Sequence, residues 1–222
     1  SGQKLEDRVF MFEQIQYACT DKDKNSDNFG QIITNAAGQW VCPDGQVGDI
    51  EQYGNQFGPG TWAASGRFTM INGLLQPLVE TQAGKIERWR LIHGGVRDTI
   101  NFRIVKSGFK AGNREEMSKI LNDVRSKPPA EQKRLIQNYC AVGAGKDYNQ
   151  SEFAVDGLTR YEMSNKLMNV LQPGYRSDIL VAFNQPGIYC VLDDATPPEA
   201  SINSLTVQKG LLKSAAAVSA NI

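Results

Sequence analysis

The sequence predicts an all-β domain, either a sandwich or a barrel, with one inserted pair of helices. Short apolar runs with a period of two recur along the chain between Gly, Pro and Asn turns, which is typical of these two architectures. One stretch near the middle follows a helical period instead. The 222 residues are 41% hydrophobic, enough for an ordinary core, and they show no internal repeat and no linker. We therefore expect a single domain over residues 1–222.

The first strand is expected within residues 8–18, "RVFMFEQIQYA". Its first residues alternate between two faces that are both apolar, with Val9 and Met11 on one and Phe10 and Phe12 on the other. A strand that is apolar on both faces is typical of an inner position in a sheet. We expect this strand to be an inner one.

A long polar stretch follows and is interpreted as an inserted loop over residues 19–65. It is rich in Gly, Asn, Asp and Gln, which favour turns over regular elements. Its large aromatic residues are Trp40, Tyr53, Phe57 and Trp62. They either form a small core for the loop itself or offer an aromatic platform to a ligand.

The remaining strands are predicted from alternation and from turn residues. Asn72 and Gly73 are the usual pair for a two-residue hairpin turn, and they separate a strand at 67–73 from strand residues within 74–95. Gly84 is expected in a second hairpin turn. The strands expected after this point are 98–106, 151–157, 165–174, 176–183 and 187–194.

Residues 107–150 are interpreted as a helical insertion. The run "NREEMSKILNDVRSK" at 113–127 has apolar residues at i, i+3, i+4 and i+7, with Asn113 as the N-cap and Glu116 completing a capping box. Those apolar residues are Met117, Ile120, Leu121 and Val124. Two prolines end this helix, and a second helix over 129–140 restarts with proline in its first turn. The sequence thus predicts a helical hairpin between two strands.

The four cysteines lack the CxxC spacing of zinc sites. They are Cys19, Cys42, Cys140 and Cys190. They form either two disulfides or free buried thiols, and we favour disulfides. Of the three pairings we favour Cys19–Cys42, because that bond would close the polar loop, and this leaves Cys140–Cys190. Disulfides indicate an oxidising compartment, so we expect a periplasmic or secreted protein.

The composition argues against two classes of partner. The chain has 24 Lys and Arg against 24 Asp and Glu, so no basic excess favours nucleic acid. No stretch approaches the roughly 20 apolar residues of a membrane span, and the opening "SGQKLEDR" does not have the pattern of a signal peptide. We expect shape, and not charge, to select the partners.

His93, the only histidine, limits the catalytic and metal chemistry open to the chain. A blue copper centre needs two His and a Cys, and a catalytic zinc needs three ligands, so one imidazole supplies neither. A Ser-His-Asp triad would have to be built on His93, and the chain has no GxSxG segment. We interpret His93 as a structural imidazole, hydrogen-bonded at the end of a strand.

Three other patterns are interpreted as ordinary surface. Residues 21–32 carry oxygen side chains at alternate positions, but Ser26 and Ile32 stand where an EF-hand loop needs Gly and Glu. The segment 143–148, "GAGKDY", has Asp147 where a phosphate loop has Ser or Thr. Several carboxylates are spread over separate predicted strands, which indicates no paired acid and base. They are Glu13, Glu80, Glu87, Asp156 and Asp178.

Three segments, in order, resemble the middle domain of three-domain multicopper oxidases, the family of laccases and copper-efflux oxidases. They are "FTMINGLLQPLVETQAGKIERWRLIHGG", "SEFAVDG" and "LMNVLQPGYRSDILVAFNQPGIYCVLDD". The family pattern is an Asn-Gly hairpin followed by RWR, a strand ending in Asp-Gly, and a strand pair around Pro-Gly. The match runs from Arg8 to Asp194 and is interrupted by the loop 19–65 and the helices at 113–140.

The resemblance implies a cupredoxin-like Greek-key β-sandwich. It also implies that copper is bound by flanking cupredoxin domains, on HxH pairs and an HCH segment that this sequence lacks, so no cofactor is expected in this chain. The residues that match the motifs would then be structural, with Trp89 in the core and Arg176 paired with Asp178. The full set is Gly73, Gly84, Trp89, His93, Pro173, Gly174, Arg176 and Asp178.

The first hypothesis, from this resemblance, is a middle domain without copper ligands or catalytic residues. It would position the two copper-bearing domains of the same enzyme and shape part of the substrate entrance. The whole enzyme would oxidise phenolic or metal-ion substrates and reduce O2 to water. The second hypothesis is a stand-alone secreted binding module that presents the aromatic loop to a glycan or a protein. The third is an enzyme that works through His93.

Overall fold

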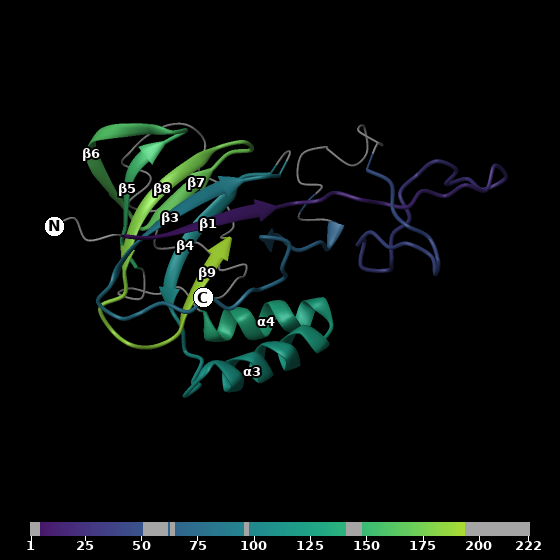
Figure 1. Cartoon of the computed structure of the whole chain (residues 1–222). Coiled ribbons are helices and arrows are strands. Elements are labelled where there is room, and N and C mark those ends of the chain that lie inside the picture. Colours follow the sequence, from purple (N-terminus) through teal and green to yellow (C-terminus); the bar gives the residue numbers. More distant parts are fainter. Residues whose placement is uncertain (1–4, 51–61, 63–64, 96–97, 141–147, 194–222) are drawn as a thin grey trace.

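The computed structural model describes residues 5–50, 62, 65–95, 98–140 and 148–193. It contains a six-stranded sheet, in the order β2-β1-β3-β8-β5-β6, and a three-stranded sheet, in the order β7-β4-β9 (Figure 1). The strands are β1 (Glu6–Glu13), β2 (Met70–Ile71), β3 (Ile86–His93), β4 (Ile100–Lys106), β5 (Gln150–Val155), β6 (Leu158–Lys166), β7 (Met168–Leu171), β8 (Arg176–Ala182) and β9 (Tyr189–Asp193). The helices are α3 (Arg114–Ser126) and α4 (Pro129–Tyr139). The predicted sandwich with a helical hairpin is therefore confirmed.

The core between the two sheets is built by alternate residues of the strands. On β3 the side chains of Trp89 and Leu91 are 0% exposed, and on β4 those of Ile100 and Ile104 are 0% exposed as well. Phe10 packs edge-on against Trp89, with ring centroids 4.8 Å apart. Trp89 therefore fills the core, as the sequence predicts.

The strand β1 lies between β2 and β3, and it pairs with β3 in parallel from Glu6 opposite Glu87 to Phe12 opposite His93. The inner position of this strand is confirmed, and only one of its two apolar faces is buried. Its outer face looks away from the core, and Val9 and Met11 are 48% and 39% exposed there.

The Asn-Gly turn forms, and the strand predicted within 74–95 is confirmed as β3, but the strand predicted at 67–73 is mostly absent. Asn72 and Gly73 have φ values of 52° and 73°, the backbone of a type I′ turn. The strand β2 has only two residues, and 74–85 contains no strand, only an isolated bridge at its first residue. Pro77 has no N–H for a ladder and follows Gln76, whose φ is 49°, so an extended pairing is interrupted there.

A second type I′ turn produces a strand that the sequence analysis does not predict. Asp156 and Gly157 have φ values of 49° and 83° and join β5 to β6 in an antiparallel hairpin. The predicted strand over 165–174 is wrong in its bounds, because it spans the end of β6 and all of β7.

The helical hairpin forms a third layer against the outer face of the small sheet, beside β4 and β9 (Figure 1). Asn113 caps α3 by accepting a hydrogen bond from the N–H of Glu116 at 2.9 Å. The Glu116 carboxylate bonds back to the N–H of Gly112 at 2.7 Å, one residue earlier than a capping box requires. The apolar side of the hairpin joins Val105 of β4 in one buried cluster, which includes Met117, Leu121, Val124 and Ile136.

Two disulfides join Cys19 to Cys42 and Cys140 to Cys190, the pairing that the sequence favours. The second bond ties the end of α4 to β9 inside the buried cluster under the helices. The first lies in the segment that leaves β1 and runs out of the sandwich as an arm (Figure 1). No helix within the described residues is long and apolar enough to cross a membrane.

Candidate functional site

His93 is the last residue of β3, and it is 1% exposed. Its Nε2 lies 2.6 Å from the carbonyl oxygen of Asp98, and its Nδ1 accepts a hydrogen bond from the N–H of Gly95 at 2.9 Å. Because Nδ1 accepts, the proton of the neutral ring is on Nε2, which donates to Asp98. Burial lowers the pKa of His93 below its ordinary value of 6.5, against the opposing effect of the hydrogen bond to Asp98. Both ring nitrogens are therefore occupied by the backbone.

The backbone of His93 also holds the Pro-Gly turn in place. Its N–H donates to the carbonyl of Tyr175, and its own carbonyl accepts from the N–H of Gly174, both at 3.0 Å. The N–H of Tyr175 closes the turn on the carbonyl of Gln172 at 2.8 Å, and Gly174 has a φ of 79°. This is the geometry of a type II turn with Pro173 and Gly174 at its centre.

The donor set of the chain does not fit a copper centre. Blue copper needs a thiolate and two imidazoles, whereas the four cysteines are in disulfides and the single imidazole has no free nitrogen. In the described part of the chain, no group of three or more His, Cys, Asp or Glu residues is placed to hold a metal ion.

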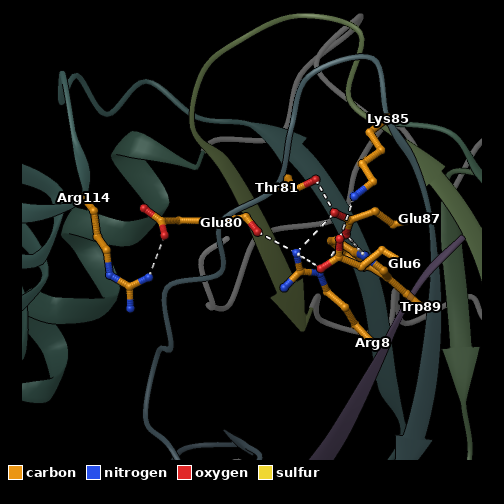
Figure 2. Close-up of polar contacts among 8 residues, drawn as sticks. All are labelled: Glu6, Arg8, Glu80, Thr81, Lys85, Glu87, Trp89 and Arg114. Atoms are coloured by element: carbon orange, nitrogen blue, oxygen red, sulfur yellow. Dashed lines mark hydrogen bonds and ion pairs between the residues drawn. The ribbon is translucent and has the colours of Figure 1, made fainter. Parts of the chain in front are cut away.

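A buried carboxylate organises the edge of the sandwich where β1 meets β3 (Figure 2). Glu87 is 1% exposed, and its oxygens accept hydrogen bonds from Nε of Arg8 at 2.8 Å, from Nε1 of Trp89 at 2.9 Å and from Oγ1 of Thr81 at 2.7 Å. Arg8 also donates to the carbonyl oxygen of Glu80 at 2.8 Å. Every donor around this carboxylate is thus provided by the chain itself.

The electrostatic surroundings keep Glu87 ionised. Burial by itself would raise its pKa, but the hydrogen bonds from Arg8, Trp89 and Thr81 outweigh burial and hold the pKa below its ordinary value of 4.5. Salt bridges from Glu6 to Lys85, at 2.7 Å, and to Arg8, at 3.0 Å, surround the pair (Figure 2). A carboxylate held ionised and fully bonded has no proton to give and no free lone pair to act as a base.

A second buried carboxylate lies across the same sheet. Glu152 on β5 is 0% exposed and accepts from Nζ of Lys166 at 2.8 Å, Oγ of Ser177 at 2.7 Å and Nδ2 of Asn169 at 3.1 Å, with Arg160 in a salt bridge at 2.6 Å. Burial opposes the charge, but these donors outweigh it and lower the pKa of Glu152 below 4.5. Like Glu87, it is a structural anion. The sequence pattern does not single out this residue.

The predicted ion pair between Arg176 and Asp178 is wrong. Asp178 pairs instead with Arg88 on the neighbouring strand β3, and Arg176 lies 3.8 Å from Asp156 at the turn after β5. Both side chains lie on the outer face of β8, and each pairs with a residue of an adjacent element and not along its own strand.

The predicted aromatic platform is not formed by its two described members. Trp40 and Trp62 are 7% and 9% exposed, so neither presents a ring to solvent. Tyr53 and Phe57 lie outside the described residues. The burial of Trp40 and Trp62 favours the other alternative, in which the aromatic residues form a small core for the loop itself.

The calcium-like segment 21–32 forms ordinary polar turns, whereas the expectation of a surface carboxylate is wrong for Glu87, which is buried. In the stretch 21–32 the carboxylate oxygens of Asp21 and Asp23 accept from backbone N–H groups two residues later, at 2.9 Å each. These are local Asx turns, in which each side chain serves the backbone next to it. Within 143–148 only Tyr148 is described, and it packs against Phe183 with ring centroids 5.0 Å apart.

The fold is similar to that of several solved multicopper oxidases. A metallo-oxidase of this kind from Campylobacter jejuni is 13% identical and matches 98% of this chain and 30% of its own, with a TM-score of 0.43. The blue copper oxidase of Nitrosomonas europaea is 14% identical and matches 85% of this chain and 36% of its own, with a TM-score of 0.38. The McoA multicopper oxidase of Aquifex aeolicus is 13% identical and matches 90% of this chain and 29% of its own, with a TM-score of 0.40.

These proteins belong to the family that the sequence motifs resemble, and the chain spans about a third of their length. No protein-family model and no curated protein matches the chain.

Proposed function

We propose that the chain is the middle, non-ligating domain of a multicopper oxidase. In this role it positions two copper-bearing cupredoxin domains and shapes part of the substrate entrance. The whole enzyme would oxidise phenolic or metal-ion substrates and reduce O2 to water, in the periplasm or outside the cell. The domain would contribute no copper ligand and no catalytic residue.

The observation that carries the proposal is that the three motif segments form one structural unit. They supply β3, β5 and β8, which are consecutive in the large sheet in the order β3-β8-β5. The motifs also contact one another through side chains, because Arg88 of the first pairs with Asp178 of the third, and Arg176 of the third pairs with Asp156 of the second. Segments that recur together in a family are expected to share such a unit.

The side chains of this unit support a scaffold role. Trp89 is buried in the core, Glu87 and Glu152 are saturated with hydrogen bonds, and His93 is bonded to the backbone at both nitrogens. All of these groups stabilise the position of a strand or a turn, and none is left with a free lone pair for substrate or metal.

The outer face of the large sheet offers a surface for a neighbouring domain. Val9 and Met11 are exposed side by side on β1, and Met11 lies opposite Ile92 on β3. Charged residues, among them Asp7 and Arg90, continue the same face. An apolar centre with a charged surround is the composition expected of a contact between domains.

The test is the size and copper content of the natural product. An antibody against this chain would capture the protein from its native source, and its intact mass and copper content would be measured. The proposal expects a mass at least twice the 24.5 kDa of the chain, with copper bound, whereas the isolated chain binds no stoichiometric copper. A natural product of about 24.5 kDa, or one tightly bound copper in the isolated chain, would overturn it.

A further inference from the structure

An open groove between α3 and the segment 74–78 takes no part in the proposed function. Its volume is about 490 Å³, within the range of ligand sites. It is lined by Leu74, Leu75, Pro77, Leu78, Arg114, Ser118, Leu121 and Arg125.

Five of the eight residues that line the groove are apolar, and the other three bring polar atoms to its surface. Leu121, from the buried side of α3, is 1% exposed, whereas Leu74 on the opposite wall is 59% exposed. Leu75, Pro77 and Leu78 are half-buried. The free energy falls when an apolar body displaces water from walls of this kind.

Two guanidinium groups stand among these apolar side chains. Arg125 is fixed in place, since it donates to the carbonyls of Leu75 and Gln76 at 3.0 and 2.6 Å, and its Nε is buried without a hydrogen-bond partner. Arg114 is 57% exposed and pairs with Glu80 through NH1 at 2.9 Å. The net charge beside the groove is therefore positive by one, from the two arginines and Glu80.

We propose that this groove binds a small organic monoanion with an apolar body, such as a medium-chain carboxylate. The apolar tail would lie against the leucines and the proline, and the carboxylate would lie near the guanidinium of Arg114, with the hydroxyl of Ser118 on the same helix as a further donor. A cation is disfavoured by the two arginines. A dianion is disfavoured because only one net positive charge is present.

The test is calorimetric titration of the purified chain with decanoate, and with decanol as the neutral analogue. The site predicts saturable 1:1 binding of decanoate and at least fivefold weaker binding of decanol. Arg114→Gln should weaken decanoate about fivefold or more and leave decanol unchanged, because Arg114 is exposed and acts through its charge. Ser118→Phe should abolish both by filling the groove.

Arg134→Gln is the matched control, since Arg134 is an exposed arginine of α4 that is also paired with a glutamate, Glu131. It should bind decanoate like the unchanged chain. Circular dichroism spectra and thermal melts of each variant show whether it still folds, so that a loss of binding can be distinguished from a loss of folding. Absence of saturable binding in the unchanged chain would overturn the proposal, and so would binding that survives Ser118→Phe or responds equally to Arg114→Gln and Arg134→Gln.

Discussion

Glu87 accepts a hydrogen bond from Nε of Arg8 at 2.8 Å, although the two residues are 79 positions apart in the chain. The side chain of Glu87 is 1% exposed and that of Arg8 is 27% exposed. This ion pair holds β1, the first strand of the domain, against β3, which belongs to the first motif segment. It also leaves a buried charge behind if its cationic partner is removed.

Arg8→Met is therefore expected to lower the free energy of unfolding by about 3 kcal/mol, because the ionised Glu87 loses its charged donor. Arg90→Met is the matched control, since Arg90 pairs with Asp7 where both side chains are exposed. That change should cost much less stability, because water screens an exposed ion pair. Urea titrations measure the free energy of unfolding of both variants. Equal losses would show that the buried pair contributes no more to stability than the exposed pair does.

His93 predicts a loss of stability in mildly acidic solution. Its folded pKa lies below 6.5, so the unfolded chain takes up the proton first as the pH falls through 6.5. The stabilisation is complete above that pH and declines below it, down to the folded pKa. Because His93 is the only histidine, His93→Gln should flatten the slope between about pH 6.5 and pH 5, where carboxylates change little. An unchanged slope in urea titrations across this interval would contradict the assignment.

Glu152 predicts a separate loss at lower pH. Its folded pKa lies below 4.5, so its contribution is present above pH 4.5 and is lost as the pH falls through the folded pKa. Glu152→Gln should destabilise the domain by about 2 kcal/mol at pH 7, because an amide cannot accept from all the donors that the carboxylate serves. The difference from the unchanged chain should shrink at pH 3. A difference that stays constant from pH 7 to pH 3 would argue against an ionised Glu152.

The two disulfides should differ in their effect on the sandwich. The Cys140→Ala/Cys190→Ala variant should lose about 2–5 kcal/mol, because that bond fixes the helical layer to β9 inside a buried cluster. The Cys19→Ala/Cys42→Ala variant should leave the main melting transition nearly unchanged and accelerate proteolysis between residues 20 and 41, because its bond closes the arm. Thermal melts and limited proteolysis measure the two effects, and equal shifts in melting temperature would show that the arm is part of the cooperative core.

The elements that were predicted accurately are those whose signals are local. The helix expected over 113–127 is observed as Arg114–Ser126, because its cap, its apolar period and its proline stop all lie within a few residues. The Asn72–Gly73 and Pro173–Gly174 turns are local in the same way. By contrast, β6 was missed although Asp156–Gly157 is a strong hairpin signal, since most of its residues are exposed and no buried face imposes an apolar period.

Partners that come from distant strands could not be predicted. Arg176 and Asp178 are close in sequence, which favoured a pair between them, yet each is bonded to a residue of another element. Nothing in the sequence distinguishes Glu87 and Glu152 from other carboxylates. Only the register of the strands and the packing of the two sheets show that Arg8 lies beside Glu87, and that Ser177 and Asn169 lie beside Glu152.

The parallel pairing of β1 with β3 also determines the order in which the chain can assemble. A growing polypeptide exposes Phe10 and Phe12 long before β3, their neighbour in the sheet, leaves the ribosome. Closing so long a loop is costly in entropy and slow, so the hairpins and helices should form first and β1 should dock late. Until then its apolar face is open to wrong partners, so this first strand of the domain is the one whose protection by a chaperone matters most.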